Sequence, residues 1–165
     1  MADNPFVQAR QRYLGHTKLM VRELWGPYLS GNQGPGQPDI WQDAVMDAYD
    51  RRDRGIAVKA CHNPGKGAVD SWIIWQQALF VFPQRVVVTA PSGPQLWDSL
   101  WNEILVWFKR LPPAWQELFE VKGDRIELKA APEDSWISAR TCRAESPEAL
   151  AGVHCEAGRV LLIPD

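Results

Sequence analysis

Apolar residues recur along this chain with two periods, and each period predicts one kind of element. Helical spacing of aliphatic and aromatic residues predicts helices over 5–29, 40–51, 68–82 and 95–111, and a short helical turn over 114–119. Short runs that are rich in β-branched residues or that alternate in polarity predict strands over 56–60, 85–90, 125–129, 136–140 and 160–163. Strands alternating with helices predict an α/β fold with a mainly parallel sheet flanked by helices.

Capping and turn-forming residues indicate where these elements begin and end. Asp39 is suited to cap the helix that begins at residue 40, and Ser146 followed by Pro147 indicates a further helix start. Residues 30–38 (SGNQGPGQP) are rich in glycine, proline and polar residues, which predicts a loop or hinge. We therefore expect an N-terminal helical segment with its linker over 1–37 and a separate domain over 38–165.

Composition and charge limit the functions open to the chain. Its 165 residues, 45% of them hydrophobic, suffice for one α/β domain with a sizeable core. The formal net charge of −2 gives no overall electrostatic reason to expect nucleic-acid binding. The sequence has no apolar run of 18 residues and no basic N-terminus followed by an apolar stretch, so we expect no membrane span, no secretion signal and an intracellular protein.

Two residue types that often indicate a site have simpler explanations here. The three cysteines, Cys61, Cys142 and Cys155, are odd in number and widely spaced, which argues against a disulfide framework. No C-x-x-C spacing accompanies them, so a structural zinc site is not expected. The aromatic stripe over 95–111 has helical spacing, which predicts tryptophans packed in the core rather than a platform for base stacking.

Residues 60–67 (ACHNPGKG) are the strongest candidate for chemistry. They match imperfectly the phosphate-binding loop G-x-x-x-x-G-K-[ST], in which backbone N–H groups cradle phosphate oxygens and the lysine reaches the β- and γ-phosphates. Gly65 and Lys66 fit this pattern. Ala60 replaces the first glycine, and Gly67 replaces the hydroxyl residue that binds Mg²⁺. We therefore expect binding to survive where hydrolysis is impaired.

The predicted elements on either side of the loop support this interpretation. A strand over 56–60 leads into the loop and a helix over 68–82 follows it, which places residues 65–68 at a helix N-terminus, where N–H groups and the helix dipole favour an anion. The alternative is an ordinary Pro/Gly turn with a solvated lysine. The residues of the loop expected to bind nucleotide are His62, Asn63, Pro64, Gly65, Lys66, Gly67 and Ala68.

The apolar run 160–163, followed by Pro164 and Asp165, resembles the Walker B strand of loop-type NTPases, in which the aspartate orients Mg²⁺. We therefore expect Asp165 to reach Mg²⁺ through water. Such a strand normally lies inside the sheet, with later strands beside it. Because the sequence stops at Asp165, we expect β-strand partners to be missing there and an apolar edge to be unpaired. If the strand is central, Val160→Asp or Leu162→Asp should unfold the domain.

Taken in order, these segments resemble the ATPase half of the large terminase subunit of tailed bacteriophages. Trp41-Gln42 resembles the adenine-side glutamine motif of that family, residues 60–67 its Walker A, and residues 89–92 (TAPS) its T-A-P-[ST] element. Residues 140–142, followed by 148–154, resemble the stretch before Walker B, and 161–165 Walker B itself. The likeness covers roughly residues 38–165. Helicase-like NTPases share the loop and the T-A-P element and are the nearest alternative.

The resemblance implies a partial P-loop NTPase domain over 38–165, without the strands after Walker B and without the nuclease domain of the family. It implies ATP and Mg²⁺ as ligands, with Gln42 on adenine edges and His62 in the place of a charge-sensing arginine. For Gln42 the alternative is an exposed polar residue on a helix, and for His62 a solvent-facing loop residue.

In the intact protein, the resemblance implies that ATP hydrolysis drives viral DNA into a capsid in the cytoplasm of a bacterial host. The implied partners are viral DNA, the portal and the small terminase subunit, and the implied assembly is a homo-oligomeric ring. Three interpretations stay open: a piece of a motor ATPase; a catalytically dead prophage remnant that serves at most as a nucleotide-binding or interaction module; and a structural domain or helicase-like fragment.

Overall fold

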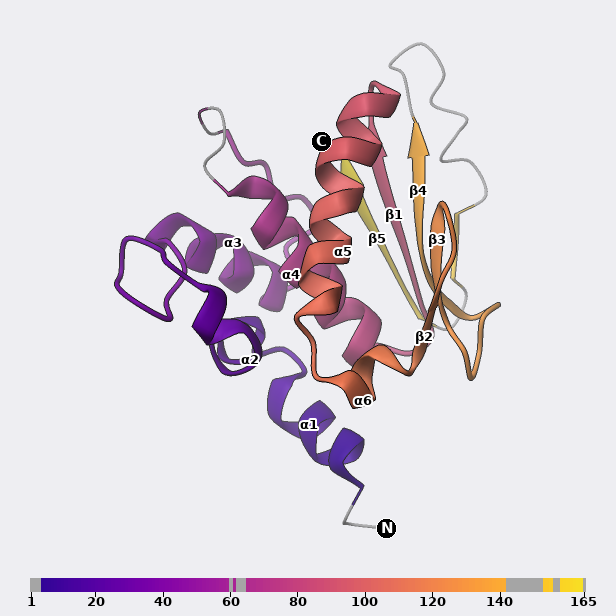
Figure 1. Ribbon diagram of the computed structural model, residues 1–165, viewed down its shortest axis with the longest axis horizontal. Helices are drawn as coiled ribbons and strands as arrows, with labels where there is room; N and C mark the ends of the chain where they lie inside the picture. Colours follow the sequence, from indigo (N-terminus) through magenta and orange to yellow (C-terminus); the bar gives the residue numbers. More distant parts are fainter. Residues whose placement is uncertain (1–3, 60, 62–64, 142–152, 156–157, 165) are drawn as a thin grey trace. The chain divides into compact units, whose positions relative to one another are not determined.

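The computed structural model describes residues 4–59, 61, 65–141, 153–155 and 158–164. Its contacts divide the chain into two compact units, residues 1–80 and 81–165. The first unit is helical, and the second contains a sheet with its own helices (Figure 1). The described chain is therefore an α/β protein with a five-stranded mixed sheet flanked by helices. The division into units does not coincide with the boundary expected near residue 37.

The first unit contains four α-helices among its described residues: α1 (Pro5–Tyr13), α2 (Thr17–Trp25), α3 (Ile40–Asp50) and α4 (Lys66–Phe80), with a 3₁₀ turn, η1 (Gly26–Tyr28), after α2. The single helix predicted over 5–29 is therefore wrong in its continuity. Gly15 has a φ of +76°, a left-handed conformation that ends a helix, and it separates α1 from α2. The helix predicted over 40–51 is confirmed by α3.

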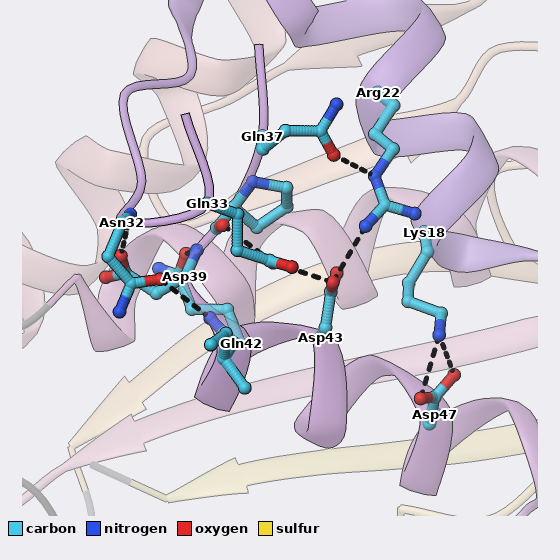
Figure 2. Close-up of polar contacts among 11 residues, drawn as sticks. Lys18, Arg22, Asn32, Gln33, Gln37, Asp39, Gln42, Asp43 and Asp47 are labelled. Carbon is cyan, nitrogen blue, oxygen red and sulfur yellow. Dashed lines mark hydrogen bonds and ion pairs between the residues drawn. The ribbon is translucent and has the colours of Figure 1, made fainter. Parts of the chain in front are cut away.

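Polar contacts join α2 to α3. The acidic partners, at positions 43, 47 and 50 of α3, share one face because residues three and four apart are neighbours on a helix. Figure 2 shows two of the resulting ion pairs. The contacts are Arg22 Nη2–Asp43 (2.7 Å), Lys18 Nζ–Asp47 (2.7 Å) and, from Thr17, the backbone N and the hydroxyl to the Asp50 carboxylate (2.8 and 2.6 Å).

The predicted loop over 30–38 is confirmed, and it is folded back on itself. Gly31 N donates to Gln37 O (2.8 Å), and a Cβ on Gly31 would lie 2.2 Å from the carbonyl carbon of Pro38. The Gln33 and Gln37 side chains then attach the loop to Asp43 of α3 and Arg22 of α2, as Figure 2 shows. The loop is thus bound to the two helices that it connects.

The sheet of the second unit has the strand order β2-β3-β4-β1-β5. β1 pairs in parallel with β4 and β5, whereas β2, β3 and β4 pair antiparallel. These strands confirm the predictions over 85–90, 125–129, 136–140 and 160–163. β2 falls partly in the predicted helical turn. The strands are β1 (Gln84–Ala90), β2 (Phe119–Val121), β3 (Arg125–Leu128), β4 (Ser135–Thr141) and β5 (Arg159–Pro164).

Helices of the second unit pack on this sheet. The helix predicted over 95–111 is confirmed as a π-helical segment, η2 (Gln95–Trp101), continued by α5 (Asn102–Lys109), and a short α6 (Pro113–Gln116) follows. η2 contacts β1 and β4. Trp101 is buried as predicted, whereas Trp97 is 37% exposed, so the prediction that the stripe lies in the core holds only in part.

The strand predicted over 56–60 is wrong. Residues 56–59 have no regular secondary structure, and Ile56 and Val58 are 40% and 37% exposed. A strand needs a neighbour for its N–H and C=O groups, and no described strand pairs with this segment. The described sheet therefore lacks the strand expected directly before the candidate loop.

β5 lies at one end of the described sheet and pairs only with β1. Its side chains alternate, with Val160 and Leu162 37% and 48% exposed and Leu161 and Ile163 half-buried. The expected unpaired apolar edge is therefore present in the described part of the chain. The strand is not central there, so the premise for unfolding by Val160→Asp or Leu162→Asp is not met.

Over the ranges that the structure describes, no helix is both long and apolar enough to cross a bilayer. The helix start predicted at Ser146 lies outside the described residues.

Candidate phosphate-binding site

α4 begins directly after the candidate loop. Gly65 has a φ of +85°, a left-handed conformation in which glycine avoids the strain of a side chain, and Lys66 is the first residue of the helix. The helix predicted over 68–82 is therefore confirmed, with bounds two residues earlier at each end. Gly65 to Ala68 are all half-buried.

The N-terminus of α4 leaves backbone donors without helical partners. The first helical hydrogen bond runs from Val69 N to Gly65 O (3.3 Å). The N–H groups of Lys66, Gly67 and Ala68 precede this bond and have no acceptor in the helix itself. Their partial positive charges add to that of the helix dipole, so this end of α4 favours an anion.

The Lys66 side chain adds a full charge to the same end of the helix. It is half-buried, and within the described residues its ammonium group forms no ion pair. Lys18, by contrast, is neutralised by Asp47. A lysine without a carboxylate partner on the first turn is suited to a phosphate oxygen.

Gln42 of α3 contacts this turn. Its Nε2 donates to Gly65 O (3.1 Å), and its Oε1 accepts from Asp39 N (2.9 Å), the second bond being part of a capping box at the start of α3. The two partners fix which way the Gln42 amide faces. Its oxygen can only accept, so it must face the Asp39 N–H, and its NH₂ group can only donate, so it must face the Gly65 carbonyl. Gln42 and Gly65 were predicted as site residues from separate parts of the sequence, and the structure brings them into contact.

Gln42 is only 6% exposed, so the alternative of an exposed helix residue is wrong. The contact with adenine stays a prediction. Each polar atom of the amide already has a protein partner, which leaves Nε2 one further N–H and Oε1 one further lone pair.

The start of α3, and with it Gln42, is held by the loop over 30–38. Asn32 N donates to the Asp39 carboxylate (2.6 Å), and Ile40 N donates to Asn32 Oδ1 (3.2 Å). Gln33 Nε2 donates to Asp43 (2.8 Å) one turn further along α3. Figure 2 shows this set of contacts converging on the first turns of α3. The role of Asn32 and Gln33 could not be predicted from the sequence, because it depends on how the loop folds.

The remaining predicted site residues are His62, Asn63, Pro64 and Asp165, and all lie outside the described residues. Within the described ranges, no group of three or more His, Cys, Asp and Glu side chains is placed to hold a metal ion. Gly67 has no side-chain oxygen, and the hydroxyl of Ser71 donates to the Gly67 carbonyl (2.7 Å). The described turn therefore offers donors to phosphate but does not fit a Mg²⁺ ligand set.

Comparison of the chain with protein-family models, with curated proteins and with solved structures finds no match.

Proposed function

We propose that this chain binds ATP at the N-terminus of α4, as the N-terminal ATPase portion of a phage or prophage terminase large subunit. The observation that carries the proposal is the start of α4, where left-handed Gly65 precedes Lys66 and the N–H groups of the first turn have no acceptor within the helix. The triphosphate would lie against these N–H groups, with the Lys66 ammonium on its β- and γ-phosphate oxygens.

The ends of two strands support the proposed relation to terminase ATPases. Residues 89–92, which resemble the T-A-P-[ST] element, lie at the carboxyl end of β1, and Thr89 is in register with Pro164 of β5. Parallel strands end at the same edge of a sheet, so the Walker B-like end of β5 and the T-A-P element share that edge.

We propose nucleotide binding, rather than efficient hydrolysis, as the activity of this chain. Gly67 takes the place of the residue that would give Mg²⁺ a hydroxyl ligand, so Mg²⁺ would arrive coordinated by phosphate oxygens and water. In the intact protein, the proposed role is to power movement of viral DNA into the capsid, together with the portal and the small terminase subunit.

Calorimetric titration of the 165-residue chain with ATP, with and without Mg²⁺, tests the proposal. We expect binding that Lys66→Ala weakens by about tenfold or more, because a charge-assisted contact with phosphate is lost. Lys59→Ala is the matched control, since Lys59 is an exposed lysine of the neighbouring segment without secondary structure. No binding by the folded chain, or equal binding by parent and Lys66→Ala, would overturn the proposal.

A further inference from the structure

We infer that Gln42 positions the phosphate-binding turn and does not read the base of the nucleotide. This inference rests on the proposed nucleotide site. Its starting point is the hydrogen bond from Gln42 Nε2 to Gly65 O (3.1 Å), which joins the start of α3 to the residue before α4.

The hydrogen bond from Gln42 to Gly65 O also orients the Lys66 N–H, which would donate to the phosphate. The Gly65 carbonyl and the Lys66 N–H belong to one planar trans peptide, so they point in opposite directions. When Gln42 holds the carbonyl, it also fixes the direction of the Lys66 N–H, away from the helix. That N–H is the first of the backbone donors at the N-terminus of α4.

Gly65 needs such a restraint. Glycine is the most flexible residue, and its left-handed φ of +85° is one of several conformations open to it. The other hydrogen bond to its carbonyl, from Val69 N, is long at 3.3 Å. A Cβ on Gly65 would lie 2.9 Å from Gln42 Nε2, so the absence of a side chain is also what allows the amide to approach.

Gln42 is itself fixed in place. Its Oε1 accepts from Asp39 N (2.9 Å), and the side chain is almost completely buried. Asp39 in turn accepts a hydrogen bond from Asn32 N (2.6 Å). The position of the Gly65 peptide is thereby set from the start of α3.

The same contacts argue against base recognition by Gln42. A glutamine reads adenine with both ends of its amide, donating to N7 and accepting from the N6 amino group. Here both ends are engaged with backbone groups, Nε2 with Gly65 O and Oε1 with Asp39 N. With 6% of the residue exposed, a base has little access to the second N–H and lone pair.

The test compares three ligands that share phosphates but differ in the base: ATP, GTP and inorganic triphosphate. Gln42→Met removes both amide hydrogen bonds at nearly constant size. We expect Gln42→Met to weaken the binding of all three ligands by the same factor, about fivefold to tenfold. The lost hydrogen bond positions the Lys66 N–H, which would donate to a phosphate oxygen in each ligand. Weaker binding of ATP alone, with triphosphate unchanged, would show base recognition and overturn the inference.

Gln77→Met is the matched control. It makes the same change at a buried glutamine of α4 that accepts a hydrogen bond from Tyr49 OH (2.8 Å), away from the turn. We expect a lower thermal midpoint with unchanged affinity for triphosphate. If Gln77→Met weakens triphosphate as much as Gln42→Met does, the effect is general destabilisation and the inference fails.

Two further variants keep the test decisive. Gly65→Ala should displace the Gln42 amide, so adding Gln42→Met to it should cause no further loss of affinity, whereas fully additive losses would contradict a shared contact. If Gln42→Met does not fold, Gln42→Glu replaces it, because glutamate accepts from Asp39 N but cannot donate to Gly65 O. Triphosphate affinity equal to that of the parent would overturn the inference.

The outcomes separate the inference from the proposed function. If the folded parent binds neither ATP nor triphosphate, the proposed nucleotide site itself is overturned. If the parent binds all three ligands with Lys66 dependence and Gln42→Met binds them equally well, the site stands and only the positioning role of Gln42 fails.

Discussion

Gly31 lies where the loop over 30–38 comes closest to itself. A Cβ at this position would lie 2.2 Å from the carbonyl carbon of Pro38 and 2.5 Å from Asp39 N, both backbone atoms that cannot move independently of the loop. We expect Gly31→Ala to lower the free energy of unfolding by about 2 kcal/mol or more, as overpacking does elsewhere. Urea unfolding measures this change.

Gly55→Ala is the control for Gly31→Ala. A Cβ on Gly55 would meet no atom within 4 Å, and the residue does not have a left-handed φ. Its stability should equal or slightly exceed that of the parent, because alanine restricts the unfolded chain. Equal stability of the two variants would contradict the tight packing of the loop.

Glu23 links α2 to the end of α1. It accepts hydrogen bonds from Arg12 and from Tyr13 OH (2.8 Å), and these bonds, that from Arg12 first, lower the pKa of Glu23 from 4.5 to about 2. Burial, followed by the hydrogen bond to Glu23, raises the pKa of Tyr13. The stability of this unit therefore depends on pH in the acid range, through the ionisation of Glu23.

The sign of the effect follows from the lowered pKa. The unfolded chain binds a proton at Glu23 near pH 4.5, and the folded chain only near pH 2, so the contribution of Glu23 is complete above 4.5 and is lost as the pH falls towards 2. We expect Glu23→Gln to reduce the fall in thermal midpoint between these pH values. Glu133→Gln, at an exposed glutamate, is the control and should follow the parent curve.

At the scale of residues, the chemistry of the candidate site could be predicted but its geometry could not. Gly65 and Lys66 are recognisable because the loop pattern depends on local sequence. Asp39 and Gln42 have the spacing of a capping box, which is also local. The contact from Gln42 to Gly65 depends on how α3 packs beside α4, and no local pattern encodes that packing.

At the scale of elements, β5 has two unlike faces. Leu162 is 48% exposed, whereas Leu161 is half-buried and in register with Val86, which is completely buried. We expect Leu162→Asp to change stability by less than about 1 kcal/mol and Leu161→Asp to reduce it by more than about 2 kcal/mol, because the latter buries a charge. Thermal unfolding of the two variants side by side measures the difference; the reverse order would show that the faces are assigned wrongly.

Elements with a clear periodic pattern were predictable, and the failures have local physical causes. The run over 85–90 is completely apolar at its centre and forms β1. The prediction over 5–29 failed because Gly15 interrupts a continuous helical pattern. The prediction over 56–60 failed because the pattern of a strand is local, while its formation requires a partner strand.

At the scale of the whole molecule, residues 1–37 are the segment expected to be separate from the ATPase domain. In the structure they share a compact unit with α3 and α4, and Met20, Val21 and Trp25 of α2 are completely buried. We expect a chain of residues 38–165 to unfold at a lower temperature than the full chain, because it loses this burial and the polar contacts of α2 with α3. An unchanged midpoint would show that residues 1–37 are independent.

The order of strands in the sheet has a consequence for how a newly made chain folds. The hairpin of β3 and β4 closes between near neighbours, but residue 84 of β1 must meet residues 135 and 159 in register. Contacts between distant residues form slowly because long loops must close first. On the ribosome, β1 therefore keeps at least one edge unpaired until residues 159–164 have been synthesised, and an unpaired edge favours aggregation.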